Sequence, residues 1–264
     1  MSFKRKYLAI PYSLFLALFV IIPILLIVYY AFSNAGGQIS LDSLVRFFSS
    51  TTKLNVLLVS FFIGVLNTLL CLIIGYPLAY FLARKQYNTN TVLVLLFVMP
   101  MWINFVLRTG ATRDLLTWIG INGGQYPYLA TMVGMVYNFL PFTILPLYST
   151  MLKLDQSQIE AAADLGANPF QVFTKSILPQ SLPGIVSAST MVFMPTMSSY
   201  VISDVLSEGK ITLFGNSIYL NFSSSQWNDG SFMALIMLAI VGITLLISRR
   251  FNKDDMSARG SNLW

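Results

Sequence analysis

The residues that most often carry out chemistry in proteins are scarce in this sequence. It contains no His and one Cys, Cys71, which lies in an apolar stretch. Ser-His and Cys-His catalysis and the usual zinc sites need residues that are missing here. We therefore expect no catalytic residue, no metal site and no cofactor held by this chain, and we interpret Cys71 as an inert buried thiol.

Nucleotide binding is the next chemistry to consider. A P-loop needs the pattern Gly-x-x-x-x-Gly-Lys-Ser/Thr, whose backbone N–H groups surround the phosphates. The only Gly-Lys pair, Gly209-Lys210, is followed by Ile211 and lacks the first glycine. If the function requires ATP hydrolysis, a partner chain must supply it.

A segment with a specific residue pattern lies between residues 153 and 182. Asp155 and Gln158 have the spacing of a capping box, and Ala161–Ala163 are strong helix formers. Gly166 accepts the positive φ that ends a helix. The pattern predicts a first short helix that ends at Gly166.

A second short helix is predicted directly after the first. Asn168 is a good N-cap, Pro169 suits the first helical position, and Pro179 is expected to end the helix. Phe170 and Phe173 are three residues apart and should share a face. Such an apolar surface could bind a groove of a partner protein or lie on the membrane surface. The residues alone leave both possibilities open.

The composition indicates the class of protein in which this segment lies. The 264 residues are 56% hydrophobic and 10% charged, with a net charge of +6. A soluble domain has about 25% charged residues. With so few ionised groups, the protein must present much of its surface to lipid. Its positive charge then indicates cytoplasmic loops beside anionic lipid rather than nucleic-acid binding.

The apolar stretches predict the spans. A membrane-spanning helix needs about 20 mostly apolar residues. Six stretches qualify, at about 8–32, 55–83, 91–108, 128–152, 183–203 and 231–248. We expect an all-α membrane protein, a six-helix bundle forming one domain over residues 1–264, with the loop 153–182 between the fourth and fifth spans. We place no ionisable group at the centre of a span, which argues against proton coupling.

Basic residues set the orientation. Cytoplasmic loops carry an excess of Lys and Arg. One side collects eleven of the 16: Lys4, Arg5, Lys6, Arg84, Lys85, Lys153, Lys175, Arg249, Arg250, Lys253 and Arg259. The other side collects Arg46, Lys53, Arg108, Arg113 and Lys210. We expect both termini and the loop 153–182 to be cytoplasmic. Within the spans, Asn67, Asn104 and Asn138 are expected to hydrogen-bond between helices.

The loop resembles a signature of the permease subunits of ABC importers. The signature is Glu-Ala-Ala, three residues, Gly, nine residues and Ile-x-Leu-Pro. Glu160-Ala161-Ala162 is followed at that spacing by Gly166 and then by Leu178-Pro179. Ser176 stands at the Ile position, with Ile177 beside it. In the family this loop is the coupling-helix pair that binds the ATPase subunit, which favours the partner-binding interpretation.

The resemblance covers nearly the whole chain and is closest to the first permease subunit of spermidine/putrescine importers. It includes Gly75-Tyr76-Pro77, Pro100-Met101-Trp102, Leu140-Pro141-Phe142, Asp164-Leu165-Gly166 and Ser203-Asp204. It implies a type I importer in a bacterial plasma membrane, with a second permease, an ATPase dimer that binds ATP and Mg, and an extracytoplasmic binding protein. The implied ATPase-coupling residues are Glu160, Ala161, Ala162, Gly166, Pro169, Phe170, Phe173, Leu178 and Pro179.

A polyamine substrate would require carboxylates and aromatic faces in a water-filled path. Asp204, after the fifth span, is the main candidate. The other candidates near the outer boundary are Tyr200, Trp102, Asn104, Tyr219 and Trp227. A helix-end carboxylate facing water and an interfacial aromatic belt are the alternative interpretations.

Two other functions remain open. The substrate could be another small solute of related importers, such as an aminophosphonate, a thiamine-like cation or iron. The chain could also be a secondary transporter or channel that works without ATP. An intramembrane enzyme is disfavoured because His is missing and no paired intramembrane Asp is seen.

Overall fold

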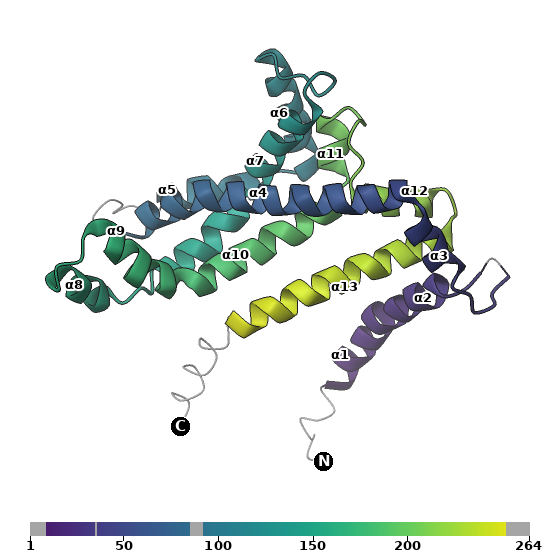
Figure 1. Cartoon of the computed structure of the whole chain (residues 1–264), viewed down its shortest axis with the longest axis horizontal. Coiled ribbons are helices and arrows are strands. Elements are labelled where there is room, and N and C mark those ends of the chain that lie inside the picture. Colours follow the sequence, from purple (N-terminus) through teal and green to yellow (C-terminus); the bar gives the residue numbers. More distant parts are fainter. Residues whose placement is uncertain (1–8, 35, 85–91, 252–264) are drawn as a thin grey trace. The chain divides into compact units, whose positions relative to one another are not determined.

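The computed structural model describes residues 9–34, 36–84 and 92–251, and all of their regular structure is helical (Figure 1). The helices before the loop 153–182 are α1 (Ala9–Leu16), η2 (Ala17–Ile21), α2 (Ile22–Ala31), α3 (Asp42–Ser49), α4 (Thr51–Ala83), α5 (Val92–Val98), η3 (Met99–Trp102), α6 (Phe105–Trp118) and α7 (Pro127–Met151). Those that follow are α8 (Gln156–Asp164), α9 (Pro169–Val172), η4 (Phe173–Ile177), α10 (Leu178–Ser198), α11 (Val201–Leu206), α12 (Phe214–Ser223) and α13 (Trp227–Phe251).

Five helical stretches in the described part are long and apolar enough to cross a membrane. They are Pro11–Ala31, Thr51–Ala83, Pro127–Met151, Pro169–Ser198 and Trp227–Arg250. A sixth is possible if the pair Val92–Trp102 and Phe105–Trp118, bent by 99°, counts as one span. The prediction of six apolar spans is confirmed in this sense.

Two predicted boundaries are wrong. The third span, expected to run through 91–108, is interrupted between Trp102 and Phe105. The fifth, expected at 183–203, begins at Pro169 and ends at Ser198, since α9, η4 and α10 form one continuous helical stretch. The basic residues at 4–6, 85, 253 and 259, which the prediction assigned to the cytoplasmic side, lie outside the described residues. The predicted orientation and the single domain over 1–264 stay predictions.

Contacts group the chain into two compact units. Residues 1–57 and 217–240 form the first unit, and residues 58–216 and 241–264 form the second. In the first unit, Asp229 on α13 forms ion pairs with Arg46 on α3 at 2.6 Å and with Lys53 on α4 at 2.7 Å. Asn228 beside it donates to the carbonyl oxygen of Ser33 at 2.7 Å. These bonds connect the start of α13 to α3 and to the end of the first span.

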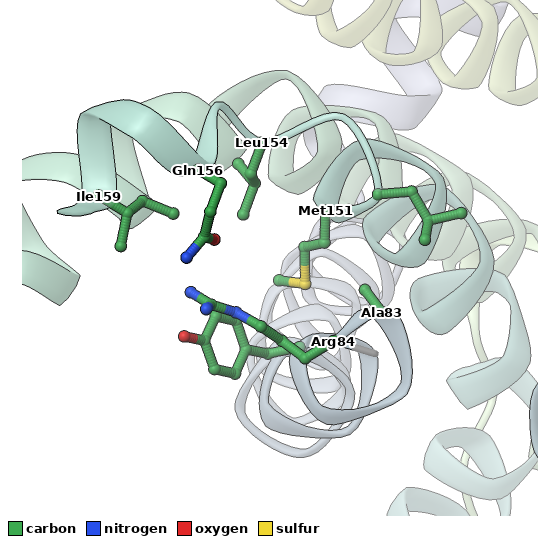
Figure 2. Close-up of a pocket in the computed structure, with 8 residues that line it drawn as sticks. Ala83, Arg84, Met151, Leu154, Gln156 and Ile159 are labelled. Atoms are coloured by element: carbon green, nitrogen blue, oxygen red, sulfur yellow. The ribbon is translucent and has the colours of Figure 1, made fainter. Parts of the chain in front are cut away.

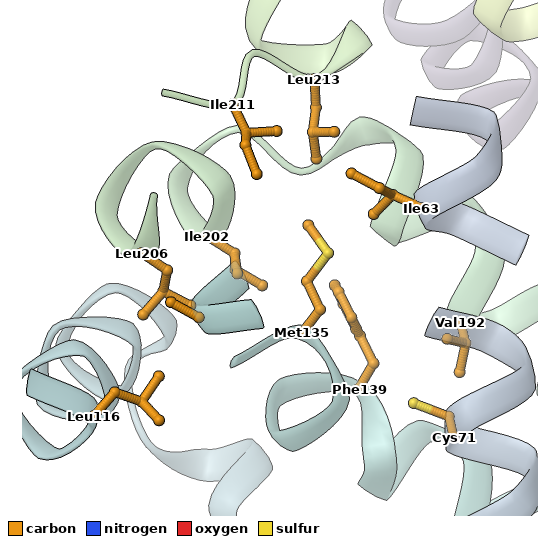
Figure 3. Packing of buried hydrophobic residues seen from close by; sticks show 11 residues of the cluster. Ile63, Cys71, Leu116, Met135, Phe139, Val192, Ile202, Leu206, Ile211 and Leu213 are labelled. Atoms are coloured by element: carbon orange, nitrogen blue, oxygen red, sulfur yellow. The ribbon is translucent and has the colours of Figure 1, made fainter. Parts of the chain in front are cut away.

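In the second unit, a cluster of buried apolar side chains joins the helices (Figure 3). Ile63 and Cys71 of α4 face Met135 and Phe139 of α7, and Ile202 and Leu206 of α11 pack beside them. Figure 3 also shows Val192, Leu116, Ile211 and Leu213 in this cluster. The cluster therefore draws on helices far apart in sequence, and Cys71 is buried in it as predicted.

Polar contacts also join helices of the second unit. The amide nitrogen of Asn67 donates to the hydroxyl of Thr196 at 2.7 Å, which links α4 to α10. Between the same two helices, a side chain at Gly64 would place its Cβ 3.0 Å from Phe193. The lack of a side chain thus allows α4 and α10 to approach closely, a common device in membrane helix packing.

Candidate functional site

The first element of the site is α8, which follows the fourth span. The carboxylate of Asp155 accepts a hydrogen bond from the backbone N–H of Ser157 at 3.0 Å and another from its hydroxyl at 2.6 Å. These bonds lower the pKa of Asp155, the hydroxyl bond contributing most. Asp155 is the predicted N-cap, but the cap is made with Ser157 and not through a box with Gln158. The N–H of Asp155 donates to the side-chain oxygen of Gln180 at 2.9 Å, which joins the start of α8 to α10.

The turn after α8 has the geometry of a Schellman motif. Gly166 has φ +82°. Its N–H donates to the carbonyl of Ala163 at 2.9 Å, and the N–H of Ala167 donates to that of Ala162 at 3.2 Å. Only glycine adopts this φ without strain, so the residue type fixes the turn. The predicted helix end at Gly166 is confirmed.

The second helix of the loop begins as predicted and continues further. Asn168 accepts from the N–H of Gln171 at 2.8 Å, and Gln171 accepts from the N–H of Asn168 at 3.1 Å, a complete capping box with Pro169 at the first position. Pro179 does not end the helix, so that prediction is wrong. The π-turn η4 precedes it, and the wider turn around Lys175 gives the proline ring room beside the carbonyl four residues earlier.

The two most exposed large apolar side chains of the loop lie on either side of the turn. Leu165 is 89% exposed and Phe170 is 73% exposed. Phe173, which was expected to share the face of Phe170, is half-buried and packs against Tyr76 of α4 with ring centroids 5.7 Å apart. Ile159 of α8 is buried. The loop therefore presents Leu165 and Phe170 on the two sides of Gly166.

The remaining predicted coupling residues lie along the same segment. Glu160 and Ala161 are exposed, Ala162 and Leu178 are half-buried, and Pro179 is exposed. The carboxylate of Glu160 accepts from the side-chain amide of Gln156 at 3.0 Å. Figure 1 shows α8 and α9, in green, where α10 begins.

A cavity of about 390 Å³ lies between α8 and the ends of α4 and α7 (Figure 2). Arg84 extends into it beside Gln156, and its guanidinium lies 4.8 Å from the centre of the Tyr80 ring. Met151 and Leu154 provide an apolar wall.

The candidates for a cation path are distributed over both units. Asp204 and Tyr200 are exposed at α11, which packs against α6 and α7. Trp102 is 76% exposed at the break of the bent pair and not at the outer end of a straight span. Tyr219 and Trp227, in the first unit, are each 52% exposed.

Asn104 has a different role from the one predicted. Its side-chain oxygen accepts from the N–H groups of Val106 at 2.9 Å and Leu107 at 3.3 Å. It caps α6 rather than bonding to another helix. The prediction of bonds between helices is confirmed for Asn67 and Asn138 and is wrong for Asn104.

The sequence reasoning missed Arg108, which it assigned to an outer loop. Arg108 is 7% exposed. Its Nε donates to the side-chain oxygen of Asn138 at 2.8 Å, and another guanidinium nitrogen donates to the carbonyl of Pro100 at 2.5 Å. The ring of Tyr137 lies 5.7 Å from the guanidinium carbon. Its partner Asn138 is near the middle of α7, so a buried guanidinium lies against an apolar helix, which the sequence reasoning did not expect.

These contacts give Arg108 a structural function. It ties both sides of the 99° bend, α6 and the carbonyl of Pro100, to α7. Arginine stays protonated in proteins, so its burial does not supply a proton-coupling group. A guanidinium has several donors in a fixed plane and can hold several backbone and side-chain oxygens at once.

Comparison with known proteins identifies the family of this chain. The family model for the "Binding-protein-dependent transport system inner membrane component" matches residues 4–253. The chain belongs to this family. It is therefore a multi-pass inner membrane protein and a component of a transport system rather than a catalytic enzyme.

Curated relatives of this inner membrane component extend over its length. It is 32% identical to the spermidine/putrescine transport system permease protein PotB of Escherichia coli K12, over 90% of this chain and 95% of that protein. It is also 32% identical to PotB of Haemophilus influenzae, over 96% of this chain and 95% of that protein.

Solved structures share the fold. A bacterial ABC transporter involved in the import of alginate superimposes with a TM-score of 0.67 at 17% identity, over 93% of this chain and 94% of that chain. A second structure, the alginate transporter in complex with a periplasmic protein bound to an alginate pentasaccharide, gives a TM-score of 0.70 at 12% identity, over 94% and 93% of the two chains. The predicted type I importer permease fold is confirmed.

One signal could have revealed Arg108 from the sequence. Pro100 and Asn104 come shortly before it, and a proline followed by a capping residue is typical of a helix break. A break there would have turned the segment back toward the other helices. The apolar stretch at 91–108, however, is also long enough to be a straight span.

Proposed function

We propose that this permease imports polyamines of the spermidine and putrescine class by alternating access. The observation that carries the substrate class is the 32% identity to two PotB proteins over 90% or more of the chain. The exposed carboxylate of Asp204 and the aromatic ring of Tyr200 beside it have the chemistry that binds ammonium groups.

ATP hydrolysis belongs to a partner in this proposal. The chain has no P-loop sequence, so an ATPase dimer binds ATP and Mg and acts on this subunit from outside. The loop of α8 and α9 is the contact, because it exposes Leu165 and Phe170 around a glycine turn that fixes their spacing. A second permease and an extracytoplasmic binding protein complete the assembly.

The proposed orientation has the loop of α8 and α9 and both termini in the cytoplasm. It follows the excess of Lys and Arg on that side. Labelling a cysteine introduced by Gln158→Cys from outside intact cells tests it, because Gln158 is exposed and Cys71 is buried. We expect no labelling until the cells are opened, and labelling from outside contradicts the orientation.

Uptake of labelled spermidine and putrescine is the main test. The permease is expressed with its ATPase, second permease and binding protein in cells that lack polyamine uptake. We expect ATP-dependent accumulation of a polyamine and copurification of the ATPase. Accumulation of an aminophosphonate, a thiamine-like cation or iron in place of a polyamine would change the substrate. Uptake without the ATPase would contradict the transport class.

The variant Asp204→Asn tests the cation path. It removes one negative charge from an exposed position of α11 and keeps the shape of the side chain. We expect polyamine uptake to fall while the assembled complex is recovered in normal amount. Asp114→Asn is a matched control, because Asp114 is also exposed and already pairs with its neighbour Arg113 at 2.8 Å. Normal uptake by Asp204→Asn removes this residue from the path.

A further inference from the structure

Tyr76 of α4 has contacts that its place in an apolar span does not predict. It lies between Gly75 and Pro77 near the end of α4. A side chain at Gly75 would place its Cβ 2.8 Å from the methyl group of Thr143, so α4 approaches α7 closely at this point. The backbone that carries Tyr76 is therefore held against a neighbouring span.

The side chain of Tyr76 contacts the helix of the loop on both sides of the π-turn η4. Its ring packs edge-on against Phe173, the first residue of η4, with the ring planes at 87°. Its hydroxyl hydrogen-bonds to the hydroxyl of Ser181, beyond the turn in α10, at 2.8 Å. Ser181 in turn donates to the carbonyl of Leu178 at 2.9 Å. One tyrosine thus bridges the turn from outside.

The bridged segment is a weak point of the helix. π-turns are rare and are frequently found at functional sites. Pro179 and Pro183 follow within the first two turns of α10, and each lacks the N–H that would bond to the preceding turn. The helix from α9 to α10 can therefore bend here more easily than elsewhere. A push on α9 would be absorbed by bending unless the turn were supported.

We propose that Tyr76 is a positioning residue that supports this turn, so that a displacement of α9 moves α10 and α4 together. The inference rests on the proposed function, since it assumes that an ATPase displaces α9. It adds a second route to that function. Movement passes along the helix into α10 and also sideways, through the Phe173 ring and the Ser181 hydroxyl, into α4.

The variant Tyr76→Phe tests the proposal in the assembled transporter reconstituted in liposomes. It removes only the hydroxyl and keeps the ring that packs against Phe173. We expect the number of ATP molecules hydrolysed per substrate imported to rise about two- to tenfold, the range for losing one hydrogen bond. The melting temperature of the complex should change little. A purely structural role would lower stability and leave the ratio unchanged.

Two further variants sharpen the test. Tyr148→Phe is the matched control, since Tyr148 is also half-buried, lies on α7 outside the loop, and its hydroxyl has no hydrogen-bond partner within the described residues. It should leave the ratio unchanged. Ser181→Ala should raise the ratio at least as much as Tyr76→Phe, because it also removes the bond to Leu178. The double variant should be no worse than Ser181→Ala alone, because the Tyr76–Ser181 bond is already absent there.

The outcomes separate this inference from the proposed function. If the wild-type assembly does not import a substrate with ATP, the proposed function fails. If it does and Tyr76→Phe keeps the wild-type ratio, only the role of Tyr76 is refuted. Additive effects of Tyr76→Phe and Ser181→Ala would also refute it, since independent sites cannot form the bridge.

Discussion

Gly166 offers the sharpest test of the loop, because its replacement isolates backbone geometry from packing. Its φ of +82° is required by the two hydrogen bonds of the turn. A Cβ added at Gly166 meets no atom within 4 Å. Any effect of Gly166→Ala therefore comes from the cost of the left-handed conformation, about 1–2 kcal/mol for a non-glycine residue. That cost lowers the population of the native turn about five- to thirtyfold relative to competing conformations.

The series of substitutions has a defined order. Asn adopts the left-handed region more readily than Ala, so Gly166→Asn should be the mildest change. Gly166→Pro should be the most severe, because proline fixes φ near −65° and removes the N–H that bonds to Ala163. Such a chain cannot form the turn that holds Leu165 and Phe170 apart.

The assay is ATP hydrolysis by the reconstituted transporter, with and without its loaded binding protein. We expect stimulation to decrease in the order Gly, Asn, Ala, Pro. Gly242→Ala serves as a control, since Gly242 also has open space around it but lies within α13 at an ordinary φ. Equal stimulation for Gly166 and Gly166→Pro would refute the reasoning that the turn geometry transmits the signal.

Three other predictions concern residues with charged side chains. Arg108→Gln leaves acceptors such as the Asn138 oxygen unpaired at about 1–3 kcal/mol each, so the melting temperature of the complex should fall, and an unchanged value would contradict its role at the bend. Asp229→Asn removes two ion pairs and should lower the free energy of unfolding by roughly 1 kcal/mol. Unfolding measured in 1 M salt should show a smaller difference from the wild type. The hydrogen bonds that lower the pKa of Asp155 stabilise the start of α8 when the pH is above the ordinary pKa of an aspartate. This stabilisation is lost as the pH falls through the lowered pKa of Asp155, and hydrogen exchange at the Ser157 amide should accelerate in that pH range. Asp155→Asn should remove that pH dependence.

Local features of the loop could be predicted from the sequence because they depend on single residues. Glycine is the residue most often found with a positive φ at a helix end, as at Gly166. Asn168 followed by Pro169 favours the start of a helix. The apolar spans were also predictable, since insertion in lipid requires long uncharged stretches whatever the tertiary packing.

Other features depended on the neighbours of a residue. Pro179 should end a helix by local rules, but the π-turn before it and the bridge from Tyr76 belong to the packed structure. Phe170 and Phe173 share a helical spacing, yet Phe173 packs against an aromatic ring of α4 while Phe170 is exposed. Spacing fixes which residues lie on one side of a helix and not what that side meets.

Arg108 shows the limit most clearly. The composition, the apolar stretches, the glycine turn and the caps of the two loop helices were determined by the sequence itself, since each follows from hydropathy or from the backbone preferences of one or two residues. Whether Arg108 faces water or the interior was decided only by tertiary structure. The 99° bend brings it to Pro100 and Asn138, whose oxygens replace the water that a buried guanidinium would otherwise need.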